Sequence, residues 1–275
     1  MVDSSDKAAR FLELHRQERP LLLANAWDVG SARLLVSLGF QALASTSSGY
    51  AASLGRLDYT VDREEALAHA AALVEATELP VSADFEDGFA KDASGVAETV
   101  RLGSEIGLAG CSIEDWSSAD ERLYDLEEAA ERVAAAAEAS HGGATRVVLT
   151  ARAENHIRGK PDLDDTIARL HAFQEAGADV LYAPGIVGVE DIVKIVAAVD
   201  LPVNVLARAG LPAVDELGSL GVKRISVGGA FAFAALAAAA GAASEFFSRG
   251  TYDFLEQSAA GVKVAHDAFA ARPRD

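Results

Sequence analysis

Short runs of β-branched and apolar residues alternate with longer stretches of helical spacing along most of the chain. Strands are expected over residues 21–26, 41–46, 80–85, 110–115, 146–152, 179–183, 202–207 and 224–229, with helical periodicity between them. Strands that are separated by helices pair in parallel through right-handed crossovers. Eight such units predict a closed (β/α)8 barrel of the TIM type, and an open doubly wound sheet is the alternative.

The chain is predicted to form one domain over residues 1–275. Half of its 275 residues are hydrophobic, which is enough apolar material for one large core, and no Pro/Ser-rich linker divides it. Helical stretches at 230–248 and 252–271 follow the last strand, so a C-terminal helical extension is expected over about 230–271. No Gly-x-Gly-x-x-Gly follows the first strand and no Walker sequence is present, which weakens the nucleotide-binding alternative.

The net charge narrows the kinds of molecule that the protein can bind, and the cysteine content indicates its compartment. Lys and Arg number 24 against 42 Asp and Glu, a net charge of −18, which disfavours nucleic acid and anionic membranes. A single cysteine, Cys111, fits a reducing compartment. We expect a cytoplasmic protein, because no apolar run looks long enough to span a bilayer and the first residues do not resemble a signal peptide. An anionic substrate would then need a metal, a buried arginine or backbone amides to hold it.

Polar residues gather where the expected strands end. In order along the chain these are Asn25, Asp28, the segment 45–49, Asp84, Glu86, Glu114, Asp115, Arg152, Glu154, Asn155, Tyr182, Asn204, Gly228 and Gly229. The active sites of TIM barrels lie at this carboxyl end of the strands. The pattern therefore predicts an active site at this face.

Acidic residues follow the third expected strand in the segment LPVSADFEDGFA, residues 79–90. By strand alternation Asp84 and Glu86 share a direction, and Glu114 would face them from the next strand. Such carboxylates would repel one another unless a proton or a hard cation such as Mg²⁺ lay between them. A metal site formed by Asp84 and Glu114 is favoured over simple ion pairing. The alternative is that Glu86 and Asp87 cap the following helix.

Two further segments suit recognition of an anion. The run STSSGYAASLG contains small residues whose backbone amides could form an anion nest, although an ordinary loop is equally consistent with it. Arg152 ends a central strand and suits a bidentate grip on a carboxylate, or a structural ion pair with Glu154 or Glu114. Cys111 lies within a strand and is interpreted as a small core residue.

Several motifs in order resemble one family over about residues 20–230. NAWDVGSARLLVSLGF, the serine run with SLGRLD, SADFEDG, SIEDW, TARAEN and GVKRISVGG are together similar to the isocitrate lyase/phosphoenolpyruvate mutase superfamily, and most to its shorter members. The resemblance implies a (β/α)8 barrel that binds Mg²⁺ and an α-oxo or 2-hydroxy acid. It implies that Asp84 is the direct metal ligand and that Glu86, where the family usually has Asp, and Glu114 hold metal-bound waters.

The same resemblance implies the remaining site residues. Asp58 matches an acid that reaches the site from the loop after the second strand, and Arg152 matches the arginine that grips the substrate. The predicted catalytic residues are thus Asp58, Glu114 and Arg152. The predicted substrate-binding residues are Ser47, Ser48, Gly49, Asp84, Arg152 and Asn204, with the amides of Ser47 and Ser48 cradling the acid.

The chain departs from the family at its proton-transfer residues. The interval WSSADERLYDLEE lacks the Cys, His and Lys of the lyase loop, and Tyr182 begins a segment that replaces a His or Glu. We expect a Mg²⁺-dependent lyase that acts on a compact oxo acid such as oxaloacetate or 2-oxoglutarate, with isocitrate cleavage weak or absent. The alternatives are a phosphonopyruvate-type mutase or hydrolase and a non-catalytic oxo-acid binding protein. The resemblance also implies a homodimer or homotetramer that exchanges the C-terminal helix.

Overall fold

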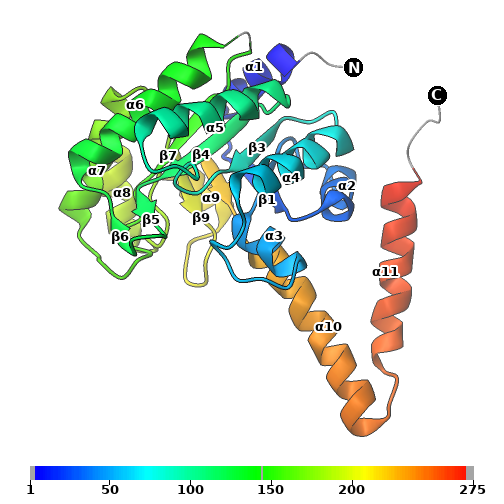
Figure 1. Ribbon diagram of the computed structural model, residues 1–275. Coiled ribbons are helices and arrows are strands. Elements are labelled where there is room, and N and C mark those ends of the chain that lie inside the picture. Colours follow the sequence, from blue (N-terminus) through cyan, green and yellow to red (C-terminus); the bar gives the residue numbers. More distant parts are fainter. Residues whose placement is uncertain (1–3, 144, 271–275) are drawn as a thin grey trace.

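The computed structural model describes residues 4–143 and 145–270 (Figure 1). Within these residues eight parallel strands close into a barrel in the order β1-β10-β9-β8-β7-β4-β3-β2. The strands are β1 (Leu21–Ala26), β2 (Leu43–Ser45), β3 (Val81–Asp84), β4 (Gly110–Glu114), β7 (Val148–Arg152), β8 (Val180–Tyr182), β9 (Val203–Leu206) and β10 (Arg224–Ser226). The predicted (β/α)8 barrel is confirmed, and each expected strand lies where its apolar run predicted it.

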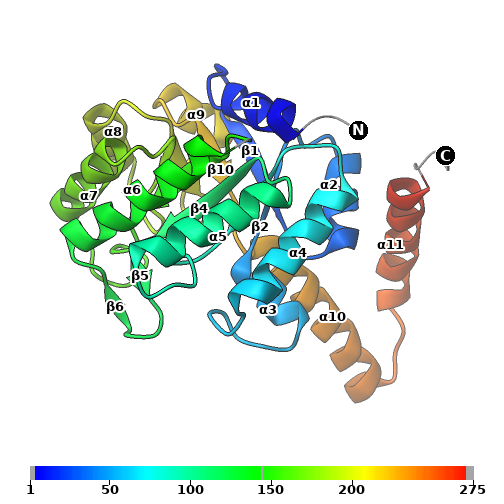
Figure 2. The same ribbon diagram turned by 45° about the horizontal axis from the view of Figure 1, so that its top comes forward.

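Helices surround the barrel, and Figure 2 shows them from a second direction. They are α1 (Ser4–Leu14), α2 (Val29–Ser37), α3 (Ser47–Ser53), α4 (Arg63–Ala76), α5 (Ala93–Glu105), α6 (Leu126–Gly142), α7 (Leu163–Glu175), α8 (Val189–Ala198), α9 (Val214–Ser219), α10 (Ala230–Arg249) and α11 (Phe254–Phe269). Aspartate caps begin several of them, because a carboxylate accepts otherwise unpaired amides of the first turn: Asp28, Asp62, Asp92 and Asp162.

Two short elements were not predicted. Helix α3 begins inside the serine run, with Thr46 as its N-cap, and the chain after β4 forms a two-stranded hairpin of β5 (Trp116–Ser117) and β6 (Arg122–Leu123). Both are too short to leave a recognisable periodicity in the sequence. The hairpin occupies the interval in which the resemblance places the catalytic loop of the lyases.

Helix α1 closes the end of the barrel at which the strands begin. Phe11 is fully buried there, in an apolar cluster with Leu21, Val148 and Val180. A side chain at Gly110 would come within 2.6 Å of the Phe11 ring, so the glycine allows this close approach. The active-site face is therefore the opposite end of the barrel.

Above this apolar layer the barrel is hollow. Inward positions that bulky branched residues usually fill are small or polar here: Ala44, Ser82, Ser112 and Ser226. The result is a cavity of about 500 Å³ that extends from the strand ends down to Leu23 and Arg224. The fold thus provides a polar pocket inside the barrel as well as at its mouth.

The last two helices form an arm that leaves the barrel. Figure 1 shows α10 extending away from the strands and α11 running back, and α11 contacts α2. Helix α10 is long and apolar enough to cross a membrane by length and composition, and only 6% of its most apolar window is buried. This modifies the sequence-based expectation that no segment is long enough. The beginning of α10 packs against α3 and β1, but most of the helix is exposed in the described chain.

Candidate active site

The cavity opens at the carboxyl ends of the strands and is lined by side chains from most of them. Its polar lining includes Ser47, Ser48, Asp58, Tyr59, Asp84, Arg152, Glu154, Arg158 and Tyr182. Among the described residues that line it there is no lysine, histidine or cysteine. The groups available for chemistry are therefore carboxylates, guanidinium groups and hydroxyls.

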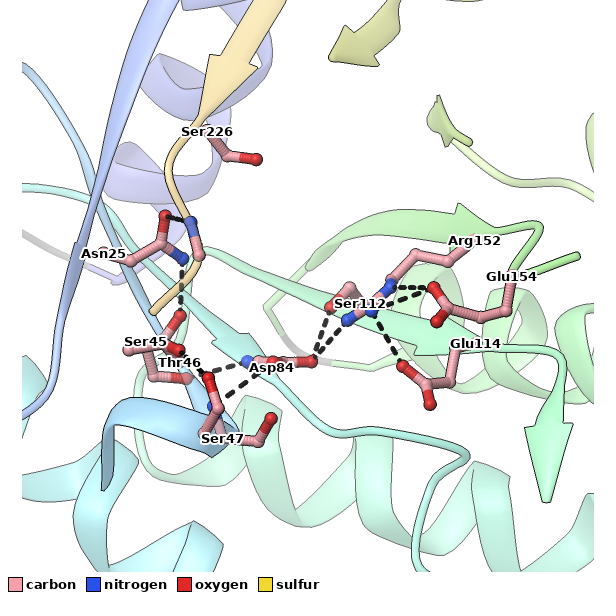
Figure 3. Close-up of polar contacts among 12 residues, drawn as sticks. Asn25, Ser45, Thr46, Ser47, Asp84, Ser112, Glu114, Arg152, Glu154 and Ser226 are labelled. Carbon is pink, nitrogen blue, oxygen red and sulfur yellow. Dashed lines mark hydrogen bonds and ion pairs between the residues drawn. The ribbon is translucent and has the colours of Figure 1, made fainter. Parts of the chain in front are cut away.

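Asp84 lies at the centre of this cluster, where β3 ends (Figure 3). Its Oδ1 accepts a hydrogen bond from Arg152 Nη1 at 2.8 Å and one from Ser112 Oγ at 3.4 Å. Its Oδ2 accepts a hydrogen bond from the Ser47 amide at 3.2 Å. The structure thus brings together the predicted ligand, the predicted arginine and the serine run, from three separate segments.

Arg152 binds three carboxylates at once. Besides Asp84, its Nη2 lies 2.9 Å from Glu114 Oε2 and 2.9 Å from Glu154 Oε1 (Figure 3). Glu114 and Glu154 are both almost completely buried, and burial raises the pKa of Glu114 well above its usual range and that of Glu154 to about 7. Both roles considered for Arg152, ion pairing and substrate binding, are available to it at the cavity wall.

Glu86 is buried next to the cluster, with a left-handed backbone (φ 48°). Strand β3 ends at Asp84, so the strand alternation used to orient Glu86 does not apply to it; its position comes from the following turn. Burial, then the negative charges of Asp84 and Asp58, raise the pKa of Glu86 to about 9. Its Oε1 has no hydrogen-bond partner, which is costly for a buried carboxyl oxygen.

The loop after α3 contributes residues that sequence reasoning partly missed. Asp58 reaches the cavity as predicted while keeping contact with solvent, and partial desolvation and the charge of Asp84 raise its pKa. Tyr59 follows with a left-handed backbone and donates its hydroxyl to Glu114 Oε1 at 2.8 Å. Arg158 contacts the Tyr59 hydroxyl and lies 3.4 Å from both Glu114 and Glu154.

Negative charge exceeds positive charge in this cluster. The carboxylates are those of Asp58, Asp84, Glu86, Glu114 and Glu154, and the guanidinium groups are those of Arg152 and Arg158. Five carboxylates against two cations leave a net charge of −3 when all are ionised, which burial strongly disfavours. A divalent cation would relieve this excess, so the donor set and the unpartnered Glu86 oxygen fit the predicted metal.

The cluster is too open to enclose an ion by itself. Among the described residues, no three groups of the His, Cys, Asp or Glu type lie close enough together to hold a metal directly. This agrees with a site of few protein ligands, in which Mg²⁺ keeps several waters. Asp84 is the predicted direct ligand, and Glu86 and Glu114 remain predicted ligands of metal-bound water.

The serine run lies at the cavity as expected, with different contacts from those predicted. Ser47 and Ser48 line the cavity, but the Ser47 amide already donates to Asp84. Gly49 lies behind them, where a side chain would meet Thr46, Trp27 and Ala232. Its role in this structure is to allow α3 to pack against α10.

Asn204 is not part of the cavity lining that the described residues form. It is 1% exposed, its Nδ2 donates to Ser226 Oγ at 3.0 Å, and its Oδ1 accepts from Arg224 Nε at 2.9 Å. Asn204 is the second residue of β9 and does not lie at its carboxyl end, so its side chain lies below the cavity mouth. Asn204 therefore supports cavity residues instead of facing the substrate space.

Cys111 is buried in β4, is not part of the cavity lining that the described residues form, and belongs to the main apolar core with Ile113. Burial raises the pKa of its thiol to about 12, so it is not a thiolate at neutral pH. We predict that Cys111→Ala changes kcat/KM by less than about twofold and lowers the free energy of unfolding by about 1 kcal/mol. Steady-state kinetics and urea unfolding check this, and loss of turnover in a folded variant would contradict it.

Comparisons with known proteins agree with this geometry. Residues 11–247 match the sequence profile of the Phosphoenolpyruvate phosphomutase family. An uncharacterized protein of Mycobacterium tuberculosis (strain H37Rv) is 35% identical over 235 residues, which cover 85% of this chain and 87% of that protein. An oxaloacetate decarboxylase of Paraburkholderia xenovorans is 30% identical over 82% of this chain and 76% of its own. A 2,3-dimethylmalate lyase of Eubacterium barkeri is 30% identical over 68% of this chain and 66% of that protein.

Solved structures share the whole architecture. A protein of Burkholderia cenocepacia J2315 that is provisionally assigned as a lyase/mutase superposes with a TM-score of 0.94, at 46% identity and 98% coverage of both chains. A 2,3-dimethylmalate lyase superposes with a TM-score of 0.83 at 26% identity, covering 96% of this chain and 92% of that one. The chain belongs to the phosphoenolpyruvate phosphomutase family and is an enzyme of the isocitrate lyase/phosphoenolpyruvate mutase superfamily.

Proposed function

We propose that the protein is a Mg²⁺-dependent carbon–carbon lyase that acts on a compact α-oxo or 2-hydroxy carboxylic acid. The observation that carries this proposal is that Asp84 and Arg152, from two strands, line one open cavity, with Glu114 of a third strand paired to Arg152. Relatives named as 2,3-dimethylmalate lyase, 2-methylisocitrate lyase and oxaloacetate decarboxylase support the reaction class.

The metal assignment depends on the residues of this chain. A phosphonopyruvate hydrolase with the same fold was solved with oxalate and Mg²⁺, but at 22% identity this likeness supports the fold alone. Asp84, Glu86 and Glu114 would hold the ion and its waters, and the bound ion would polarise the oxo or hydroxyl oxygen of the substrate. Arg152 would bind the adjacent carboxylate, because its fork lies at the cavity wall.

The remaining side chains would orient these groups and exclude water. Glu154 fixes Arg152 from behind, and Tyr59 fixes Glu114. Because no cysteine, lysine or histidine lines the described cavity, there is no counterpart of the acid/base that isocitrate-type cleavage uses in the family. We therefore propose a compact dicarboxylic acid such as oxaloacetate, 2-oxoglutarate or a substituted malate, and not isocitrate or methylisocitrate.

A substrate panel tests this function. The purified protein is incubated with Mg²⁺, or with EDTA, and oxaloacetate, 2,3-dimethylmalate, isocitrate or 3-phosphonopyruvate, while pyruvate, glyoxylate and phosphate are measured. Mg²⁺-dependent pyruvate release from a dicarboxylic acid, faster than in the same mixture without protein and without phosphate release, supports the lyase. Phosphate release from 3-phosphonopyruvate would instead identify the protein as a phosphonopyruvate-type hydrolase. Mg²⁺-dependent binding without turnover of any acid would replace the lyase with a non-catalytic binding protein.

We also propose that two or four copies assemble through the C-terminal arm. Its exposed apolar residues include Phe246, Phe247 (91% exposed), Tyr252 and Val262. Large exposed apolar patches on a soluble protein mark interaction sites. Light scattering at micromolar concentration should give a dimer or tetramer mass. Phe247→Asp should reduce that mass, whereas Arg249→Ala on the same arm should not. A monomeric wild-type protein would overturn this proposal.

A further inference from the structure

Arg224 lies at the floor of the cavity, inside the barrel, and no feature of the metal cluster above uses it. It is the first residue of β10, is 97% buried (3% exposed), and still lines the cavity. Its Nη1 donates to Thr150 Oγ1 at 3.0 Å. Thr150 precedes Arg152 by two residues on β7, so the floor lies about 7 Å below the level of Arg152.

All three partners of Arg224 are neutral acceptors. Besides Thr150 they are Asn204 Oδ1 at 2.9 Å and His15 Nε2 at 3.3 Å. His15 Nδ1 lies 2.7 Å from the Phe11 carbonyl oxygen, which can only accept, so Nδ1 carries the proton and Nε2 accepts from Arg224. Burial lowers the pKa of His15 to about 3, so the ring is neutral. The network fixes the guanidinium without neutralising it.

No carboxylate among the described residues pairs with Arg224, in contrast to Arg152, which contacts three. Burial lowers the pKa of Arg224 to about 10, so it remains a cation at neutral pH. A buried cation without a counter-ion is costly, and an anion that entered the cavity would relieve that cost. Its Nη2 makes none of the hydrogen bonds above, and the Arg224 side chain lines the cavity.

The side chains around Arg224 supply further donors to the floor. Tyr182, Ser82 and Ser226 line the same part of the cavity, and the Tyr182 hydroxyl lies beside Ser226. Ser226 Oγ accepts from Asn204 and also hydrogen-bonds the Tyr182 hydroxyl, so this pair of hydroxyls keeps one hydrogen that it can donate to a ligand. The floor therefore offers one cation and several hydroxyls, while the mouth of the same cavity is acidic.

We propose that Arg224, with Tyr182 and Ser226, forms a subsite for a second anionic group of the substrate, a carboxylate at the end remote from the oxo or hydroxyl carbon. This inference rests on the proposed function, because it takes the first carboxylate to be bound at Arg152. It specifies a dianionic substrate and assigns to Arg224 the preference for a dicarboxylic over a monocarboxylic acid. A phosphonate group offers the same anionic oxygens, and the test separates the two.

Binding of matched acid pairs in the presence of Mg²⁺ tests the subsite. Calorimetry compares malate with 2-hydroxybutanoate, 2-oxoglutarate with 2-oxopentanoate, and 3-phosphonopyruvate with pyruvate. We expect the wild-type protein to prefer one dicarboxylic acid over its partner by about ten- to a hundredfold, the range of a charge-assisted contact. Arg224→Met should abolish this preference while leaving the affinity for the monocarboxylic acid within about threefold, and Arg224→Lys should restore part of it.

His15→Gln is the matched control, because it disturbs the same network on the side away from the cavity. A preference that survives in His15→Gln and disappears in folded Arg224→Met supports the subsite. If the wild-type protein prefers only 3-phosphonopyruvate over its partner pyruvate, the floor of the cavity binds a phosphonate group, and the proposed carboxylate subsite is overturned. Equal wild-type binding of the two acids in every pair overturns the subsite without recourse to a variant. Equal losses for both members of a pair in folded Arg224→Met also overturn it. If no acid binds with Mg²⁺ at all, the proposed function fails first.

Discussion

Replacing Asp84 with alanine is expected to abolish Mg²⁺-dependent binding of oxo acids while leaving the barrel folded. Asp84 is the only predicted direct ligand, and even residues that merely orient metal ligands cost ten- to a hundredfold in affinity when changed, so a loss of more than about a hundredfold is expected. The fold should persist because Asp84 lies at the end of β3, at the cavity, and its removal lowers the excess of buried negative charge.

Calorimetric titration of Mg²⁺ measures this effect, with circular dichroism as the test of folding. Asp87→Asn is the matched control: it is three residues away, but its carboxylate accepts from Tyr124 and the Phe89 amide, outside the cavity lining. The control should keep its Mg²⁺ affinity. Unchanged affinity in Asp84→Ala would show that the metal, if bound, is held elsewhere.

Replacing Arg152 with glutamine should have two large effects. It removes the guanidinium predicted to bind the substrate carboxylate, for which a fall in kcat/KM of about a hundred- to a thousandfold is expected. It also leaves Asp84, Glu114 and Glu154 without their shared counter-ion, and breaking a buried pair from one side costs about 3–5 kcal/mol. Mg²⁺ should restore part of that stability, because it supplies positive charge to the same carboxylates.

Urea unfolding with and without Mg²⁺ measures the loss of stability, and steady-state kinetics measures the fall in kcat/KM. Arg122→Gln is the control, since Arg122 pairs with Glu128 at the surface, where an ion pair contributes about 0–1 kcal/mol. If Arg152→Gln were as stable and as active as Arg122→Gln, the interpretation of the cluster would be wrong.

The sequence predicted the barrel well because its strands are continuous apolar runs separated by long helices. Eight alternations of this kind in order indicate the barrel, and the end of each strand then identifies the active-site face. Short elements such as α3 and the β5–β6 hairpin carry no comparable signal. The left-handed backbone of Glu86 likewise cannot be inferred from a non-glycine residue, so the alternation argument for its direction was wrong although its location near Asp84 was right.

The residues that sequence reasoning missed are those whose role depends on distant contacts. Tyr59 meets Arg158 across 99 positions of the chain, and Arg224 meets Thr150 across 74. For Arg224 one signal was present: a charged residue at the start of a strand in a barrel, where an apolar side chain is usual. Asn204 shows the opposite error, because a polar residue within a strand was assigned to the substrate space and instead supports Arg224 and Ser226.

A crystal of the wild-type protein grown with Mn²⁺ and oxalate would test most directly whether this cavity binds a divalent cation together with an oxo-acid analogue. Mn²⁺ accepts the same oxygen ligands as Mg²⁺ and scatters anomalously. The predicted result is one strong anomalous peak within coordination distance of an Asp84 carboxylate oxygen, with oxalate between it and Arg152. A cavity without that peak, or a peak remote from Asp84, would contradict the proposed metal-dependent chemistry.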